Sequence, residues 1–350
     1  MASAQSPASG LSSGWLAEGS TRLHGLDALR GIAALCVVGV HAQGVFGGYP
    51  SWFSKGYLAV DFFLMLSGYL MARTSEPRLA AGLSPLRFMI ARYRRFWPMM
   101  ALGSLIGVPY LWVRAGDVAH FAPVLIANFL LIPWPLGRLM FALNIPAWTI
   151  FFELVANAAH VFGLQRLRTS TITGLALILL AVTIAAAMTF GTFDLGARPD
   201  TFFAGFPRIF LAYLIGILLQ RWGLAIRGPA MFGNMSPVGW LAMIIMPIAI
   251  IGSWYTGIKG WPFDLAFVLL VCPFTILGGL LLTRATKLGW LSGAISFPLF
   301  AVHMPVLEGM RELGFGVVVG APTAISVALI IVWWTNRPRR IKQSAQVLGE

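Results

Sequence analysis

Long apolar runs, separated by short polar loops, make up most of the chain after residue 26. Each run is about 17–22 residues long, the length that an α-helix needs to cross the hydrocarbon core of a bilayer. A further apolar stretch, 119–133, is short for a span and is expected to be re-entrant or interfacial. The pattern predicts ten membrane-spanning helices, near residues 27–46, 57–73, 95–113, 146–163, 171–190, 203–221, 238–254, 262–283, 288–308 and 315–334. The expected fold is an all-α, polytopic integral membrane protein.

The two ends of the chain depart from this pattern. Residues 1–20 are small, polar and rich in glycine and serine, which is typical of a disordered tail. They lack the charged start and apolar core of a signal peptide. Residues 337–350 carry several basic side chains and are expected to form a cytoplasmic tail. Residues 21–336 between them are expected to form one transmembrane domain.

Composition and charge support the membrane assignment and predict an orientation. Of all residues, 58% are hydrophobic and only 11% are charged. With the N-terminus in the cytoplasm, most of the 25 lysines and arginines fall on the cytoplasmic side. The positive-inside rule therefore favours both termini in the cytoplasm. It also explains the net charge of +13 without a nucleic-acid partner.

Two ionisable side chains occupy the first predicted span. Arg30 and His41 are eleven residues apart, which places them on one helix face about 16 Å apart along the axis. Arg30 is either an interfacial anchor or a functional cation, and His41 is either a packing histidine or a general base. Asp61, in the second span, lies at a similar depth to His41 and is its expected partner.

A second basic cluster precedes the third predicted span. The stretch RFMIARYRRFWPMM places Arg92 and Arg95 three residues apart, and therefore on one helix face. This spacing favours a phosphate clamp, because a guanidinium fork binds phosphate oxygens well. Arg87 and Arg94 fit ordinary positive-inside charge.

The fourth predicted span carries a polar stripe. Glu153, Asn157 and His160 share one helix face, and such a stripe usually faces a cavity or another helix. Trp148 precedes the stripe, and belongs either to the aromatic belt at the interface or to a platform for a sugar ring.

Two further ionisable residues lie in outer halves of predicted spans. Arg208 either forms a salt bridge to Glu153 or Asp61, or stabilises an oxyanion. His303 either makes a structural hydrogen bond or takes part in catalysis. The chain has no HExxH motif, no paired Cys/His ligand set, no GxSxG elbow and no P-loop, so no metal is expected.

Five stretches, in order, resemble the membrane-bound acyltransferase-3 family, whose members acylate bacterial surface and exported carbohydrates. LDALRGIAALCVVGVH resembles the family's Arg-x10-His signature, and GYLAVDFFLMLSGYLM resembles its glycine–valine–aspartate–phenylalanine stretch. RYRRFWP is similar to its Arg-x-x-Arg motif, and WTIFFE to its Trp-Ser-Leu-x-x-Glu motif, with Thr149 replacing serine. ISFPLFAVHMPV is similar to its late His-x-Pro motif, with Phe297 and Phe300 where tyrosines are usual.

The resemblance implies an enzyme of the bacterial inner membrane. It implies acyl-CoA, most often acetyl-CoA, as the cytoplasmic donor, a carbohydrate hydroxyl as the acceptor, and an essential histidine at His41. Membrane lipid and polysaccharide-assembly proteins are the other expected partners. No metal cofactor is implied.

The residues and the resemblance together predict one mechanism. His41 acts as general base, oriented by Asp61 or Glu153. Arg30, Arg92 and Arg95 hold the CoA phosphates or the entrance for the thioester. Trp148, Arg208 and His303 contact the substrate.

Three alternatives stay open. The acyl group could pass through a covalent acyl-histidine instead of moving directly to the acceptor. The acceptor could be an exported small metabolite or a lipid. The chain could also be a proton-coupled transporter, because intramembrane charges suit that function equally well.

Overall fold

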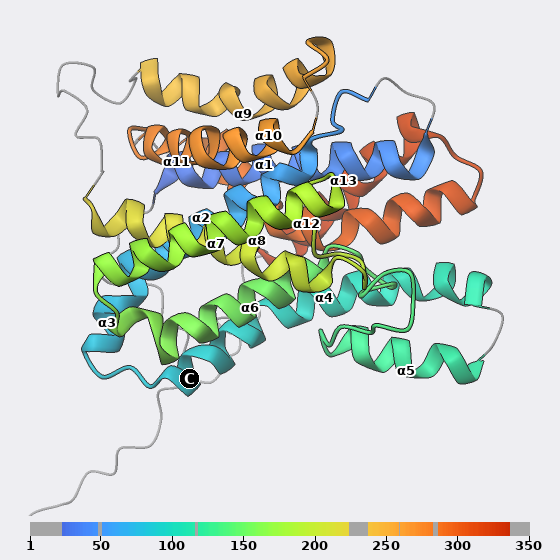
Figure 1. The fold of residues 1–350 in the computed structure, drawn as a ribbon. Helices are drawn as coiled ribbons and strands as arrows, with labels where there is room; N and C mark the ends of the chain where they lie inside the picture. Colours follow the sequence, from blue (N-terminus) through green and yellow to red (C-terminus); the bar gives the residue numbers. More distant parts are fainter. Residues whose placement is uncertain are drawn as a thin grey trace, which may run out of the picture.

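Helices account for all the regular secondary structure in the described part of the chain, which confirms the all-α prediction (Figure 1). The computed structural model describes residues 23–47, 51–115, 118–223, 237–258, 260–282 and 286–336. The predicted tails, 1–20 and 337–350, lie outside these residues.

Within the described ranges, eight of the predicted spans form helices long and apolar enough to cross a membrane. One of them is a continuous helix that contains a five-residue π-helical segment, η6. The eight are α1 (His24–Phe46), α4 (Pro85–Ala115), α7 (Thr169–Phe190), α8 (Phe202–Arg221), α9 (Pro237–Tyr255), α10–η6–α11 (Trp261–Ala266, Phe267–Val271 and Cys272–Gly279), α12 (Lys287–Glu312) and α13 (Val317–Thr335).

The other two predicted spans are helical but shorter or interrupted. The second consists of four consecutive segments, η2 (Gly56–Leu58), α2 (Ala59–Leu70), the π-helical η3 (Met71–Ser75) and α3 (Glu76–Ala80). The fourth is α6 (Ala147–Phe162), with 16 residues, followed by η4 (Leu164–Arg166). The stretch expected to be re-entrant or interfacial forms α5 (Val118–Phe129), whose 12 residues are too few to span a bilayer.

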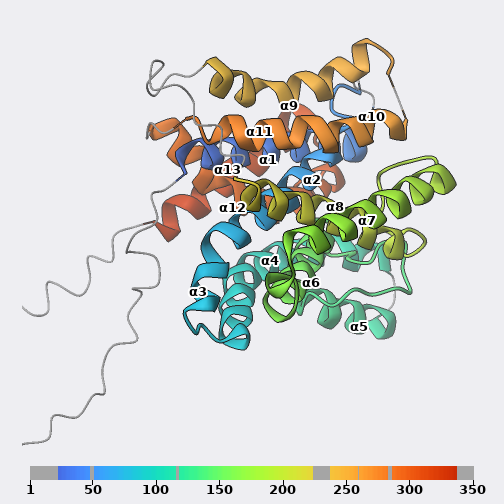
Figure 2. The ribbon, with the colours of Figure 1, turned by 60° about the vertical axis from the view of Figure 1, so that its left-hand side comes forward.

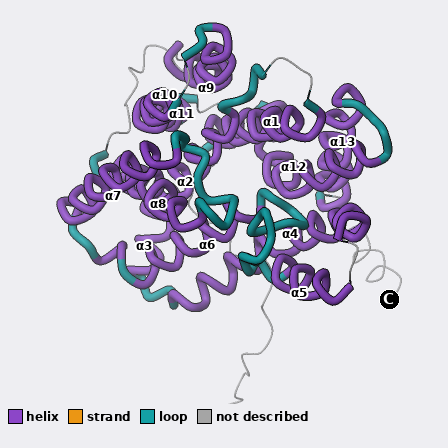
Figure 3. The backbone as a smooth tube through the Cα atoms, turned by 45° about the vertical axis from the view of Figure 1, so that its right-hand side comes forward, coloured by secondary structure: helices purple, strands orange, loops and turns teal. Residues whose placement is uncertain are grey.

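The helices form a bundle whose centre is surrounded by α1, α2, α4, α6 and α12 (Figures 2 and 3). α5, α7, α9 and α13 lie at the periphery. α1 packs most extensively on α12, and α2 on α8. α7 and α13 are largely exposed, as expected for helices that face lipid, whereas most of α8 is buried.

Small residues allow α2 and α8 to pack closely. A Cβ atom on Gly68 would overlap the carbonyl of Tyr213, and a Cβ atom on Gly216 would overlap the carbonyl of Met65. Close backbone approach at glycine is the usual way in which membrane helices associate. This contact places Asp61 of α2 beside Arg208 of α8.

α1 and α12 run parallel. At one end, Gly293 of α12 lies against Asp27 of α1. At the other, His303 of α12 contacts His41 of α1. The two helices therefore face each other along the whole distance between Arg30 and His41.

Candidate active site

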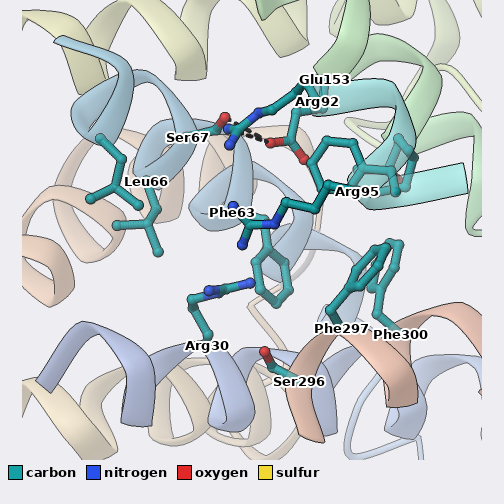
Figure 4. A pocket seen from close by; sticks show the side chains of 14 residues that line it. Arg30, Phe63, Leu66, Ser67, Arg92, Arg95, Glu153, Ser296, Phe297 and Phe300 are labelled. Carbon is teal, nitrogen blue, oxygen red and sulfur yellow. Dashed lines mark hydrogen bonds and ion pairs between the residues drawn. The ribbon is translucent and has the colours of Figure 1, made fainter. Parts of the chain in front are cut away.

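Three arginines meet at a cavity of about 100 Å³ between the central helices (Figure 4). Arg30 comes from α1, and Arg92 and Arg95 come from one face of α4. Arg30 and Arg95 point toward each other across the cavity, so Arg30 is not directed into lipid. The other lining residues are Phe63, Leu66, Ser67, Leu70, Phe96, Thr149, Ile150, Glu153, Ser296, Phe297 and Phe300.

Glu153 is the one acidic residue among those that line the cavity. It accepts a hydrogen bond from the Ser67 hydroxyl at 2.8 Å and pairs with the Arg92 guanidinium at 3.4 Å. Asp27 of α1 also lies 4.0 Å from the Arg30 guanidinium. Three cations against two carboxylates still leave the cavity positive, which suits an anionic ligand. Glu153 therefore orients Arg92 and does not contact His41.

Two polar atoms of residues that line the cavity lack a hydrogen-bond partner. Within the described ranges, Arg92 Nε and the Thr149 hydroxyl are buried without a hydrogen-bond partner. Buried donors are nearly always satisfied in folded proteins, so an unsatisfied pair that lines a cavity indicates a ligand site. Thr149 occupies the position where the family motif has serine.

A histidine pair lies farther along α1 and α12. His41 Nδ1 is 2.7 Å from His303 Nε2, and the two rings are stacked with their centroids 5.0 Å apart. His303 is fully buried, whereas His41 is partly exposed. His41 is therefore the more accessible member of the pair.

The hydrogen bonds of this pair define its tautomers. His303 Nδ1 lies 2.9 Å from the carbonyl oxygen of Leu299, which can only accept, so His303 Nδ1 carries the proton. In the neutral ring, His303 Nε2 is then an acceptor, and His41 Nδ1 must donate to it. This assignment leaves His41 Nε2 with a lone pair, as a general base or a nucleophile requires.

Aromatic rings connect the cavity to the histidine pair. Phe63 and Phe300 both line the cavity, and their rings are in contact at 5.9 Å between centroids. The Phe300 ring also packs against His303 at 6.1 Å. A chain of aromatic contacts therefore links the cavity to His303, and through it to His41.

The expected pairing of Asp61 with His41 is wrong. Asp61 forms a two-pronged ion pair with Arg208, at 3.0 and 2.7 Å, and both side chains are fully buried. Arg208 also donates to the carbonyls of Leu195 and Tyr57. A guanidinium, which carries a full positive charge, stabilises a buried carboxylate better than a neutral imidazole does. The salt-bridge interpretation of Arg208, to Asp61, is the one that the structure supports.

Trp148 is also buried, with 6% of its surface exposed. It packs edge-on against Phe152, and the Arg208 guanidinium lies 6.0 Å from the centre of its ring. Burial inside the bundle does not fit a ring that faces the lipid interface or one that forms an open platform for a sugar.

The polar stripe on α6 continues toward another helix and not along the cavity. Tyr213 of α8 donates to Asn157 at 3.1 Å, and His160 Nε2 lies 3.2 Å from Glu76. Arg221 also binds Glu76, at 2.7 Å. Glu76, His160 and Arg221 therefore form a charged group near the ends of α6 and α8.

Sequence reasoning missed a network beside the Asp61–Arg208 pair. Tyr57 donates to Asp264 at 2.6 Å, and Lys55 Nζ lies 2.6 Å from the other oxygen of the same carboxylate. Asp264 is fully buried at the start of an apolar run. An acidic residue in such a run is the signal that could have found this network.

The described residues form a polytopic membrane protein with a positive cavity and, farther along α1 and α12, a histidine pair. The model of the acyltransferase-3 family, which describes an acyltransferase domain, matches residues 23–337. The chain belongs to this family and is a multi-pass membrane acyltransferase.

Two relatives support this assignment. "Protein 2 in picA locus" from Rhizobium radiobacter is 33% identical over 182 residues, which cover 46% of this chain and 93% of the relative. "Putative membrane-bound transacylase BcsY" from Komagataeibacter xylinus is 32% identical over 103 residues, which cover 29% of this chain and 24% of the relative. No solved structure matches the chain.

Proposed function

We propose that this protein transfers an acyl group, most often acetyl, from cytoplasmic acyl-CoA to a hydroxyl of a surface or exported polysaccharide. The observation that carries the proposal is the arrangement of the site. A positive cavity is joined by Phe300 to a histidine pair whose hydrogen bonds leave His41 Nε2 unprotonated. The family resemblance supports a carbohydrate acceptor and the bacterial inner membrane.

The cavity and its rim suit different parts of the donor. A volume of about 100 Å³ is too small for a nucleotide, so only the narrow pantetheine arm of the donor would enter the cavity. Arg95 is exposed at the rim and would bind the CoA phosphates. The arm would then extend along Phe63 and Phe300 toward His41.

The chemical step follows from the tautomers. His41 Nε2 takes the proton of the acceptor hydroxyl as its oxygen attacks the thioester carbonyl. The carbon–sulfur bond then breaks, and the CoA thiolate leaves and takes the proton from His41. His303 Nε2 accepts from His41 Nδ1–H throughout, which keeps the ring oriented and supports the imidazolium.

A covalent variant of this step uses the same lone pair. His41 Nε2 would attack the thioester and carry the acyl group as an acyl-imidazole until the hydroxyl arrives. Rapid quenching with radiolabelled acyl-CoA, in the absence of acceptor, separates the two routes. Label trapped on the wild-type protein but not on His41→Gln would show the covalent route.

Replacement of Arg95 with glutamine is expected to raise the KM for acyl-CoA about 10- to 100-fold, because a charge-assisted contact to phosphate is lost. The kcat should change much less, since Arg95 is remote from the reacting atoms. Arg94→Gln is the matched control, because Arg94 belongs to the same helix but does not line the cavity. Equal KM values for the two variants would exclude Arg95 as a donor-binding residue.

The proposed function is tested by the O-acyl content of surface and secreted polysaccharide in a deletion strain. Complementation with the wild type should restore O-acylation, and His41→Ala, at equal membrane abundance, should not. O-acylation that is independent of the gene would exclude a polysaccharide acceptor. It would favour a small exported metabolite, a lipid or a transported substrate.

A further inference from the structure

A proline removes one backbone hydrogen bond from α12 beside the histidine pair. Pro305 lies inside the helix, two residues after His303. Because proline has no N–H group, the carbonyl of Ala301, four residues earlier, loses its helical donor. Asn144, from the loop before α6, supplies a replacement, with its Nδ2 donating to the Ala301 carbonyl at 2.8 Å.

The surroundings of Asn144 show that this contact is specific. The side chain is 1% exposed, and its Oδ1 is buried without a partner among the described residues. A flipped amide would turn Oδ1 toward the Ala301 carbonyl, oxygen against oxygen, so the orientation is determined by this one hydrogen bond. Gly103 of α4 also packs here, where a Cβ atom would overlap the same carbonyl.

Two carbonyls of one helical turn are therefore bound by side chains. Leu299 accepts from His303 Nδ1–H, which defines the tautomer of His303. Ala301 accepts from Asn144. His303 lies between the bound carbonyl of Ala301 and the residue that opens the turn, Pro305.

We propose that Asn144 is a positioning residue for the histidine pair, a role that rests on the proposed function. It holds the proline-opened turn of α12 in the shape that aims His303 Nε2 at His41 Nδ1. Asn144 acts only through this turn and does not contact the reacting atoms. Loss of its donor lets the turn relax, weakens the histidine–histidine hydrogen bond and allows His41 to sample the other tautomer.

A second buried asparagine provides a matched control. Asn128 of α5 donates to the carbonyl of Met140 and accepts from the backbone N–H of Leu143. It holds the same loop as Asn144 but has no hydrogen bond to α12. Asn128→Leu therefore loosens the loop alone, whereas Asn144→Leu also frees the Ala301 carbonyl.

The first test is kinetic. Asn144→Leu should lower kcat about 10- to 100-fold, because a misplacement of about 1 Å at a catalytic group has an effect of that size. The KM for acyl-CoA should stay unchanged, and Asn128→Leu should keep most of kcat. Equal losses of kcat in the two variants would overturn the proposal, as would an unchanged kcat in Asn144→Leu.

The second test does not depend on activity. ¹⁵N NMR of histidine-labelled protein in nanodiscs distinguishes protonated from unprotonated ring nitrogens, with signals assigned by His41→Gln and His303→Gln. Wild type and Asn128→Leu should show one tautomer for each ring, and Asn144→Leu a mixture at His41. Wild-type-like spectra in Asn144→Leu would exclude the positioning role. If no acyl transfer is found for the wild type, a tautomer mixture in Asn144→Leu still supports the role, and only the proposed function fails.

Discussion

Acyl transfer by His41→Ala is expected to be about 10²- to 10⁴-fold slower than by the wild type, the contribution of a well-placed general base. If the covalent route operates, the loss is at least as large, because the nucleophile itself is removed. The measurement is the initial rate of labelled acyl transfer by purified protein in nanodiscs. His24→Ala is the matched control, because His24 lies on the same helix at its opposite end.

His303→Gln is expected to show a smaller loss. The glutamine side-chain oxygen can accept from His41 Nδ1–H, but it lacks the bond to the Leu299 carbonyl that holds the ring of His303. A wild-type rate in His41→Ala would exclude the base assignment. A loss in His303→Gln greater than that in His41→Ala would show that the roles are reversed.

The second large effect concerns the Asp61–Arg208 pair and is expected in folding. Asp61→Asn or Arg208→Gln alone leaves one buried charge without its partner, which destabilises a protein by about 3–5 kcal/mol. The double variant Asp61→Asn/Arg208→Gln removes both charges and leaves two neutral amides that can hydrogen-bond. It should therefore recover much of the stability lost in either single variant.

Thermal unfolding of the three variants in detergent measures this coupling, and acyl transfer by the double variant tests the role of Asp61. Recovered stability together with recovered activity would show that Asp61 is structural. Recovered stability without recovered activity would show that Asp61 has a role in catalysis. Additive losses of stability would contradict the buried pair.

Local periodicity predicted the parts of the molecule that depend on one helix at a time. The length of each apolar run predicted the helices, and the eleven-residue spacing placed Arg30 and His41 on the face of α1 that packs on α12. The three-residue spacing of Arg92 and Arg95 brought both to the cavity. These features follow from helical geometry, which the sequence shows directly.

Partner choice could not be predicted in the same way, because it depends on which helices are neighbours. Depth alone made Asp61 a plausible partner for His41. The close packing of α2 on α8 instead brings Arg208 to Asp61, and the parallel packing of α1 on α12 brings His303 to His41. The spacing of residues along the chain predicts neither contact, since the partners are separated by 147 and 262 residues.

The role of Asn144 was hidden for a related reason. The position of Pro305 predicts a free carbonyl at Ala301, but not which side chain will bind it. The donor comes from a loop 157 residues away in the sequence. The sequence does not distinguish Asn144 from other polar loop residues, because the contact with α12 exists only in the folded structure.

In the proposed function, His41 delivers a cytoplasmic acyl group to an acceptor on the other side of the membrane. Inverted membrane vesicles, whose cytoplasmic face is outward, test it most directly when supplied with radiolabelled acetyl-CoA. The wild type should place base-labile label on polysaccharide inside the vesicles, and His41→Ala, at equal abundance, should place none above background. Label that appears equally with both proteins, or with neither, would contradict it.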